Sequence, residues 1–210
     1  MTTDPPATYG LVLAGGLSRR MGGGDKPLVE IDGKTILERV LTVLSGQCVG
    51  LVINANGDPT RFARYGQPVV ADNVPGFVGP LAGILAGLDW VASHAPDVEW
   101  VVSSPGDCPF LPADLVARLH DARRTQRLPL ACARSGEFRH PVAGLWPITC
   151  REGLRGVLTN EGLRKIEVFT ARHGVAFAQW HTEPIDPFFN VNTPEDAARA
   201  EATAQRVRSA

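Results

Sequence analysis

A glycine-rich loop behind a short apolar run near the N-terminus restricts the folds open to this chain more than any other feature. The run from Gly10 to Ala14 is closed by Gly15 and Gly16, a pattern typical of a buried strand that enters a tight loop. Gly15 is the first of five glycines that precede Lys26. Because glycines leave backbone N–H groups uncovered by side chains, the loop predicts an anion-binding turn at the end of a strand.

The charges of this loop are consistent with a polyphosphate ligand. Arg19, Arg20 and Lys26 outweigh the single negative charge of Asp25. Bare backbone amides and a cationic excess in one short segment together favour a ligand with several phosphate groups. A glycine-rich turn with solvated arginines is the less specific alternative.

Two common phosphate-binding loops do not fit the sequence. The P-loop of NTPases ends in Gly-Lys followed by a hydroxyl residue, whereas Lys26 lies between Asp25 and Pro27. The dinucleotide fingerprint needs glycines at its first, third and sixth positions, and Gly22 with Gly24 would require a glycine where Pro27 stands. The loop is therefore of another kind.

The loop resembles the signature of nucleotidyltransferases that activate sugars and cofactors, which reads Leu-Ala-Gly-Gly, then Arg-Met-Gly and a lysine. Its Gly-Gly-x-Asp-Lys form is similar to that of the molybdenum cofactor guanylyltransferases, the MobA family. The residues in step are Leu13, Ala14, Gly15, Gly16, Arg20, Met21, Gly22, Gly23, Asp25 and Lys26. The segments Gly79 to Gly83 and Asn190 to Glu195 also resemble the family, so the similarity spans residues 10 to 196.

This resemblance implies a reaction and a set of site residues. The family transfers GMP from Mg-GTP to molybdenum-bound molybdopterin and releases pyrophosphate, so GTP, molybdenum-molybdopterin and Mg²⁺ are the expected ligands. Arg20, Lys26 and Asp107 are the expected catalytic residues, and Asp107 is the expected metal ligand. The expected nucleotide-binding residues are Leu13, Ala14, Gly15, Gly16, Gly22, Gly23, Lys26, Asn54, Asp72, Gly79 and Asp107.

Alternating strand and helix patterns predict an α/β fold. Strands are expected at 10–14, 50–53, 69–71 and 100–103, with helices at 35–45 and from Pro80 through Val91, and a further helix started by Pro112. Such alternation is typical of a three-layer, doubly wound, mostly parallel sheet with right-handed crossovers. The resemblance implies that this sheet has a Rossmann-like nucleotidyltransferase fold. At 210 residues, one domain is expected, with a nucleotide-binding half at 8–128 and an acceptor-binding half at 129–205.

Three polar residues follow the predicted strands of the first half. In an open α/β sheet, ligands bind at the carboxyl ends of the strands, where Asn54, Asp72 and Asp107 fall. A nucleotidyl transfer needs a carboxylate for a divalent ion beside the α-phosphate, and Asp107 is the candidate. The carboxylate of Asp72 can accept hydrogen bonds from guanine N1 and N2, which favours guanine. Ordinary turns at strand ends are the alternative for Asn54 and Asp107.

The second half departs from strict alternation. Strands are expected at 130–133, 142–146 and 175–180, one of them antiparallel, with helices at 148–158 and 162–172. Thr193 is a natural N-cap for a last helix, with Pro194 at its first position. Asn190 and Asn192 are expected to present amides to the acceptor, whereas His140 fits a structural role as well as a ligand-binding one.

Composition excludes several other classes. A net charge of −1 offers no global field for nucleic acid or a membrane surface, and the four cysteines lack a Cys-x-x-Cys pair. The N-terminus has no signal-peptide pattern, so a cytoplasmic protein is expected, monomeric or a weak homo-oligomer. Disorder is expected only at residues 1–7 and after Gln205. His94, His120, His173 and His181 are expected to be solvated.

Several functions stay open on the sequence alone. A related transferase with another nucleotide or acceptor, such as a cytidylyltransferase of the same cofactor, a sugar-phosphate transferase or a phospholactate guanylyltransferase, shares the loop chemistry. A binding module that carries nucleotide or pterin to a molybdenum-inserting protein is an alternative of a different class. The presence of both Lys26 and Asp107 favours an enzyme.

Overall fold

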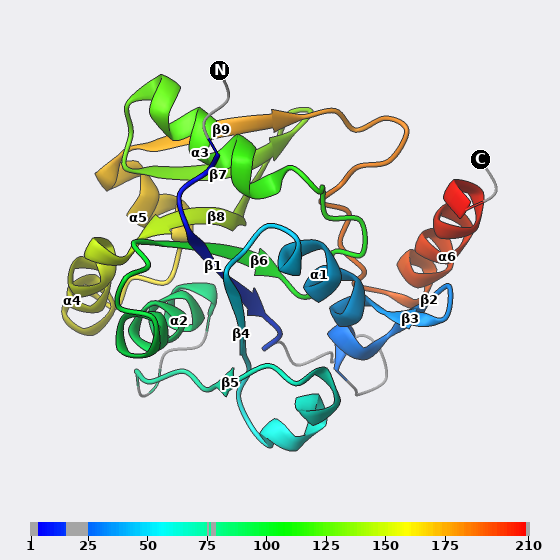
Figure 1. Cartoon of the computed structure of the whole chain (residues 1–210), viewed down its shortest axis with the longest axis horizontal. Helices are drawn as coiled ribbons and strands as arrows, with labels where there is room; N and C mark the ends of the chain where they lie inside the picture. Colours follow the sequence, from blue (N-terminus) through cyan, green and yellow to red (C-terminus); the bar gives the residue numbers. More distant parts are fainter. Residues whose placement is uncertain (1–3, 16–24, 75, 77–78, 209–210) are drawn as a thin grey trace.

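A seven-stranded mixed sheet forms the centre of the protein (Figure 1). The computed structural model describes residues 4–15, 25–74, 76 and 79–208. The strand order is β5-β4-β1-β6-β8-β7-β9. The strands are β1 (Thr8–Leu13), β4 (Gly50–Asn54), β5 (Val69–Val70), β6 (Trp100–Pro105), β7 (Leu130–Ser135), β8 (Phe138–Pro147) and β9 (Val175–Trp180).

Only β8 runs against its neighbours in this sheet. Strands β1, β4, β5 and β6 pair in parallel, as do β7 and β9, whereas β8 pairs antiparallel with both β6 and β7. The parallel strands consequently end on one side of the sheet, which we call the carboxyl edge. The predicted mostly parallel α/β sheet with one antiparallel strand is confirmed.

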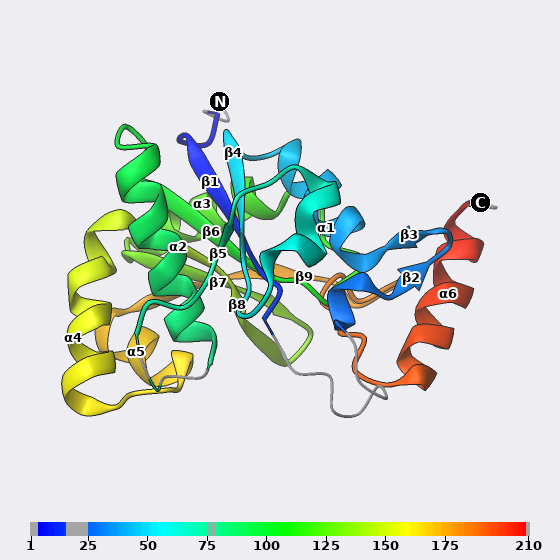
Figure 2. The ribbon, with the colours of Figure 1, turned by 90° about the horizontal axis from the view of Figure 1, so that it is seen from below.

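Helices cover both faces of the sheet and bury two apolar clusters against it. Helix α1 (Ile36–Ser45) and α3 (Leu115–Gln126) contribute to one cluster, which includes Val12 and Ile53. Helix α2 (Pro80–His94), α4 (Arg151–Glu161) and α5 (Ile166–His173) contribute to the other, which includes Leu11 and Val52. Successive strand residues thus face opposite layers, as the period of two requires. Figure 2 shows α2, α4 and α5 together on one side of the molecule.

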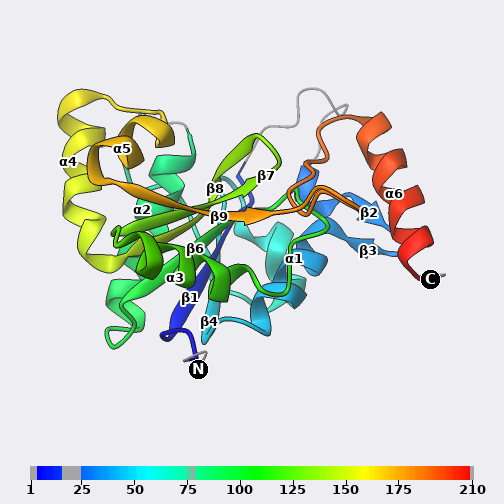
Figure 3. The ribbon, with the colours of Figure 1, turned by 90° about the horizontal axis from the view of Figure 1, so that it is seen from above.

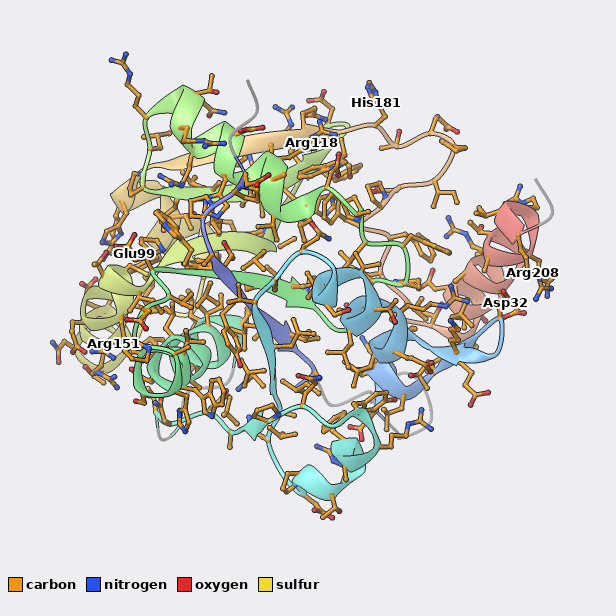
Figure 4. The ribbon with its side chains drawn as sticks, in the orientation of Figure 1. Asp32, Glu99, Arg118, Arg151, His181 and Arg208 are labelled. Atoms are coloured by element: carbon orange, nitrogen blue, oxygen red, sulfur yellow. The ribbon has the colours of Figure 1, made fainter. Side chains whose placement is uncertain are left out.

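A small accessory unit lies beside the main sheet. It consists of the hairpin β2 (Glu30–Ile31) and β3 (Lys34–Thr35), with helix α6 (Pro194–Arg208) against it. Figure 4 shows Asp32 and Arg208 next to each other, and their ion pair spans 2.9 Å. The Asp32 backbone N–H also donates to Glu201 Oε2. These contacts bring the C-terminal helix next to the segment that follows the glycine-rich loop.

Three predicted boundaries are wrong. Helix α3 begins at Leu115 rather than at Pro112, because the Pro112 carbonyl accepts from Leu115 N in a turn that precedes the helix. Helix α5 begins at Ile166 and not at residue 162, since Gly162 has a φ of 64° and caps α4. Disorder was expected after Gln205, but α6 continues to Arg208.

His120 is buried, contrary to the sequence-based expectation of a solvated side chain. Its ring is fully enclosed, lies 2.8 Å from Thr8 Oγ1 and meets the ring of Trp100 edge to face. Burial lowers its pKa to about 4. The burial of His120 could not be predicted from the charge pattern of α3. Arginines lie near the histidine in sequence, but its own side chain faces the sheet. All four cysteines are free thiols.

Candidate functional site

The first part of the glycine-rich loop starts at the centre of the carboxyl edge. Leu13 is the last residue of β1 and pairs with Asn54, the last residue of β4. Ala14 N donates to Asn54 O at 2.8 Å, so Ala14 and Gly15 continue the chain at this edge. Of the remaining predicted loop residues, Gly16, Arg20, Gly22 and Gly23 lie outside the described part of the chain. Their roles stay predictions.

Lys26 points toward the C-terminal half of the molecule. It opens the short 3-10 helix η1 (Lys26–Leu28), and its Nζ donates to Asn192 Oδ1 at 2.6 Å across 166 residues of sequence. Asn192 is fixed by the start of α6, because its backbone N–H and that of Thr193 both donate to Asp196 Oδ2. The predicted N-cap is confirmed, since Asp196 N donates back to Thr193 Oγ1. The lysine that follows the glycine-rich loop therefore contacts a residue that the sequence predicts to bind the acceptor.

Asp107 lies two residues after the end of β6 and close to Lys26. Gly106 N donates to Leu13 O, and Val191 N donates to Asp107 O, both at 3.0 Å, so the backbone of this turn is held from two sides. Burial raises the pKa of the Asp107 carboxyl above its ordinary value, and the nearby Lys26 ammonium opposes that rise. A carboxylate that loses hydration on burial gains from a cation placed beside it.

A hairpin and a thiol hold the segment that carries Asn190. The His140 ring stacks on Phe188 with centroids 4.6 Å apart, and its Nε2 lies 2.7 Å from Ser135 Oγ. Burial lowers the pKa of His140. The thiol of Cys108 donates to Asn190 Oδ1, which leaves the amide N–H groups of Asn190 as the donors available to a ligand.

Asn54 and Asp72 meet at the next two strand ends. Asn54 Nδ2 donates to Asp72 Oδ1 at 3.0 Å, and Asn56 Nδ2 donates to Asp72 Oδ2 at 2.9 Å. Asn56 Oδ1 in turn accepts from Asp72 N. Each carboxylate oxygen has a second acceptor position, so Asp72 can still accept two donors from a base edge.

Two glycines, one before helix α2 and one within it, shape the part of α2 that lies near Asn54. Gly79 caps its N-terminus with a φ of 148°, a conformation that other residues rarely adopt. Gly83 lies so close to Asn54 that a Cβ added there would be 2.2 Å from Asn54 Oδ1. The second glycine therefore makes room for the Asn54 side chain.

Gly83→Ala is expected to weaken GTP binding about 10-fold, because the added methyl pushes the Asn54 amide away from Asp72 and a hydrogen bond to a charged group is lost. Titration calorimetry measures the effect. Gly156→Ala in α4 is the matched control, since a Cβ there meets nothing within 4 Å. It should leave GTP binding unchanged. Unaltered affinity in Gly83→Ala would show that Asn54 does not depend on this close approach.

Two exposed cations in the connection between α4 and α5 were not among the predicted site residues. Arg164 and Lys165 are exposed in the connection between α4 and α5. Figure 3 shows this connection and the start of α6 on the same side of the molecule, at the top of the view. The sequence pattern placed these two residues inside a continuous helix over 162–172 and therefore did not predict a connection there. The left-handed cap at Gly162 shows instead that the chain leaves the helix just before the pair.

The described residues fit a metal ion that is held largely by its substrate. Within residues 4–15, 25–74, 76 and 79–208, no three His, Cys, Asp or Glu side chains gather at one point. Mg²⁺ commonly binds through one or two carboxylates together with substrate phosphates and water. A single carboxylate, Asp107, beside a lysine matches that mode better than a closed protein cage.

Solved structures with the same fold define the class. The chain matches a molybdopterin-guanine dinucleotide biosynthesis protein A from Archaeoglobus fulgidus with a TM-score of 0.73 and 26% identity, over 94% of this chain and 99% of that one. It also matches a CMP:2-keto-3-deoxy-manno-octonic acid synthetase complexed with CTP, with a TM-score of 0.72 at 13% identity over 96% and 99% of the two chains. The chain therefore has the fold of these nucleotidyltransferase structures.

Sequence comparison gives the family. A family model described as the MobA-like NTP transferase domain matches residues 10–176. The molybdenum cofactor guanylyltransferase of Nitrobacter hamburgensis is 59% identical, covering 97% of this chain and 98% of that protein. That of Bradyrhizobium sp. strain ORS 278 is 60% identical, covering 94% and 93%. The chain belongs to the MobA-like NTP transferases and, within them, to the molybdenum cofactor guanylyltransferases.

A Mycobacterium tuberculosis protein solved as a complex with manganese matches with a TM-score of 0.64 at 20% identity, over 94% of this chain and 99% of that chain. Among the helices that the structure describes, none is long and apolar enough to cross a membrane.

Proposed function

We propose that the carboxyl edge of the sheet transfers GMP from Mg-GTP to the terminal phosphate of molybdenum-bound molybdopterin. Pyrophosphate leaves, and the guanine dinucleotide form of the cofactor results. The observation that supports this site is the convergence of Lys26, Asp107 and Asn192 from three distant parts of the chain. Residues 8–128 provide the nucleotide side, and residues 129–205 provide most of the acceptor side.

The transfer itself is a substitution at phosphorus. An oxygen of the acceptor's terminal phosphate attacks the α-phosphorus of GTP, and the bond to the oxygen that bridges the α- and β-phosphates breaks. The bonding electrons leave with pyrophosphate. Because attacking and leaving groups are both phosphate oxygens, catalysis depends on alignment and on charge neutralisation more than on a strong base.

Each group of predicted residues has a part in that alignment. The backbone amides from Gly15 to Gly23, with Arg20 and Lys26, hold the β- and γ-phosphates. Lys26 neutralises charge that moves toward the leaving group, and its contact with Asn192 keeps it near the acceptor. Asp107 would hold Mg²⁺, which supplies charge neutralisation at the α-phosphate when bound.

The acceptor side consists of amides and cations. Asn190 and Asn192 present amide groups from the segment before α6. Arg164 and Lys165 supply positive charge for the anionic acceptor at the same edge of the sheet. Delivery of the acceptor by a molybdenum-inserting protein, a cytoplasmic location and a monomeric or weakly oligomeric state remain predictions.

GTP is expected to bind more tightly than ITP, ATP, CTP or UTP in the presence of Mg²⁺. ITP lacks the N2 amine that donates to Asp72, and the other three offer no matching pair of donors. Asp72→Asn should weaken GTP binding about 10- to 100-fold, since a hydrogen bond to a charged group is lost, while ATP binding stays unchanged. Titration calorimetry with the five triphosphates tests both expectations. Tighter binding of CTP or UTP by the wild-type protein would exclude the guanine assignment.

A product assay with purified acceptors separates this reaction from its alternatives. Molybdenum-molybdopterin with Mg-GTP should give pyrophosphate and the guanine dinucleotide. A sugar phosphate or phospholactate in place of the pterin should give neither. Binding of GTP without pyrophosphate release from any acceptor would support a nucleotide or pterin carrier instead.

A further inference from the structure

The guanidinium of Arg61 makes three contacts that bridge two parts of the carboxyl edge. Arg61 lies in the 3-10 helix η2 (Pro59–Tyr65), which follows β4. Its Nε donates to Asp58 O at 2.9 Å, and its Nη2 donates to Asn56 O at 2.7 Å. Its Nη1 forms an ion pair with Asp25 Oδ1. The Asp25 side chain is only 18% exposed, so this is not a freely solvated surface pair.

The two ends of this bridge belong to different parts of the proposed site. Asp25 directly precedes Lys26, whose Nζ reaches Asn192. Asn56 holds Asp72 through its own amide, at 2.9 Å in each direction. Arg61 therefore joins Asp25, the residue before Lys26, to the turn whose Asn56 side chain holds the proposed base-reading carboxylate of Asp72.

The negative charge of Asp25 lies next to the Lys26 ammonium in sequence, and the contact with Arg61 compensates it. Consecutive Cα atoms lie about 3.8 Å apart, so a rotation of the Asp25 side chain can bring its carboxylate to the Lys26 ammonium. An uncompensated carboxylate at this position would also repel the triphosphate. A guanidinium with three fixed partners holds Asp25 away from both and cancels its charge locally.

We infer that Arg61 is a positioning residue for GTP, which neutralises Asp25 so that Lys26 stays free for the triphosphate and which fixes the turn from Asn54 to Asp58. This inference rests on the proposed function, because it assigns the triphosphate to Lys26 and the base to Asp72. Arg61 itself touches no reacting atom. Its effect is on the affinity for GTP and on KM, with little effect on kcat.

Removal of the guanidinium is expected to raise the Kd and the KM for GTP about 10-fold, while kcat changes less than about 3-fold. Two variants test this, Arg61→Ala and Arg61→Gln. The glutamine retains an amide donor for the Asn56 carbonyl but has no charge for Asp25. Arg64→Ala is the matched control, since Arg64 lies in the same 3-10 helix and contacts Tyr65. It should bind GTP like the wild type.

Asp25→Asn provides the decisive readout. Much of the cost of removing one partner of a shielded ion pair comes from the charge left behind. Adding Asp25→Asn to Arg61→Gln should therefore restore GTP binding to within about 3-fold of the wild type. A role limited to holding the fold would show no such rescue, and thermal melting of each variant checks folding directly.

Wild-type affinity in Arg61→Gln, or a double variant as weak as Arg61→Gln alone, overturns the inference. Failure of the wild-type protein to bind GTP with Mg²⁺ would instead overturn the proposed function. Loss of affinity in Arg61→Gln with recovery in the double variant supports the inference, even if Arg61→Ala fails to fold.

Discussion

Asp107→Asn is expected to lower kcat for GMP transfer about 100- to 1,000-fold, because the metal contributes several kcal/mol of charge stabilisation in the transition state. Asparagine keeps the size of the side chain and removes its charge. The backbone contacts of Asp107 with Val191 do not depend on the side chain, so the turn should keep its shape. GTP affinity should fall far less than turnover. A pyrophosphate-release assay, with titration of GTP alongside it, measures both.

The metal dependence of this variant gives a second readout. The wild-type rate should saturate at a lower Mg²⁺ concentration than the rate of Asp107→Asn, because the variant offers no carboxylate to the ion. Asp97→Asn is the control, since Asp97 is an exposed residue between α2 and β6, before the start of the strand that Asp107 follows. Unchanged turnover in Asp107→Asn would remove this residue from the metal site.

Local sequence patterns predicted the order and type of the main elements well. Strands and helices alternate with strong periodicity in the first half of the chain. The pattern accounts for the burial of Val12, Ile53 and Val102 together in the apolar cluster on one face of the sheet. The errors occur where a local signal competes with tertiary structure. Pro112 looks like a helix start, but the chain makes one turn before Leu115 enters α3. His120 looks solvated among charged neighbours, yet its ring faces Thr8 and Trp100.

The candidate site was predictable as separate residues but not as an arrangement. Strand-end rules placed Asn54, Asp72 and Asp107 at one edge, and the structure brings the first two into direct contact. No pattern in the sequence indicates that Lys26 bonds Asn192 across 166 residues, because that contact depends on the path of the chain around β9 and α6. The contacts of Arg61 with Asp25 and Asn56 could not be predicted either, because they also depend on the path of the folded chain.

Lys26→Ala is expected to weaken triphosphate binding and to lower kcat about 100-fold, a loss similar to that of removing a fixed donor from other charge-stabilising sites. The Lys26 ammonium lies close enough to Asp107 to oppose the rise that burial causes in the pKa of that carboxyl. Its removal should therefore raise the pKa of that buried carboxyl further and weaken metal binding at low pH. Pyrophosphate release measured as a function of pH and GTP concentration resolves these effects.

Two controls separate the charge of Lys26 from its packing and from general electrostatics. Lys26→Arg retains the charge but spreads it over a planar group, so it should recover part of the affinity for GTP and less of kcat. Lys34→Ala removes a lysine from the exposed hairpin formed by β2 and β3 and should leave both quantities unchanged. An equal loss of activity in Lys34→Ala would mean that net charge, rather than the position of the Lys26 ammonium beside Asn192 and Asp107, governs the binding of the triphosphate.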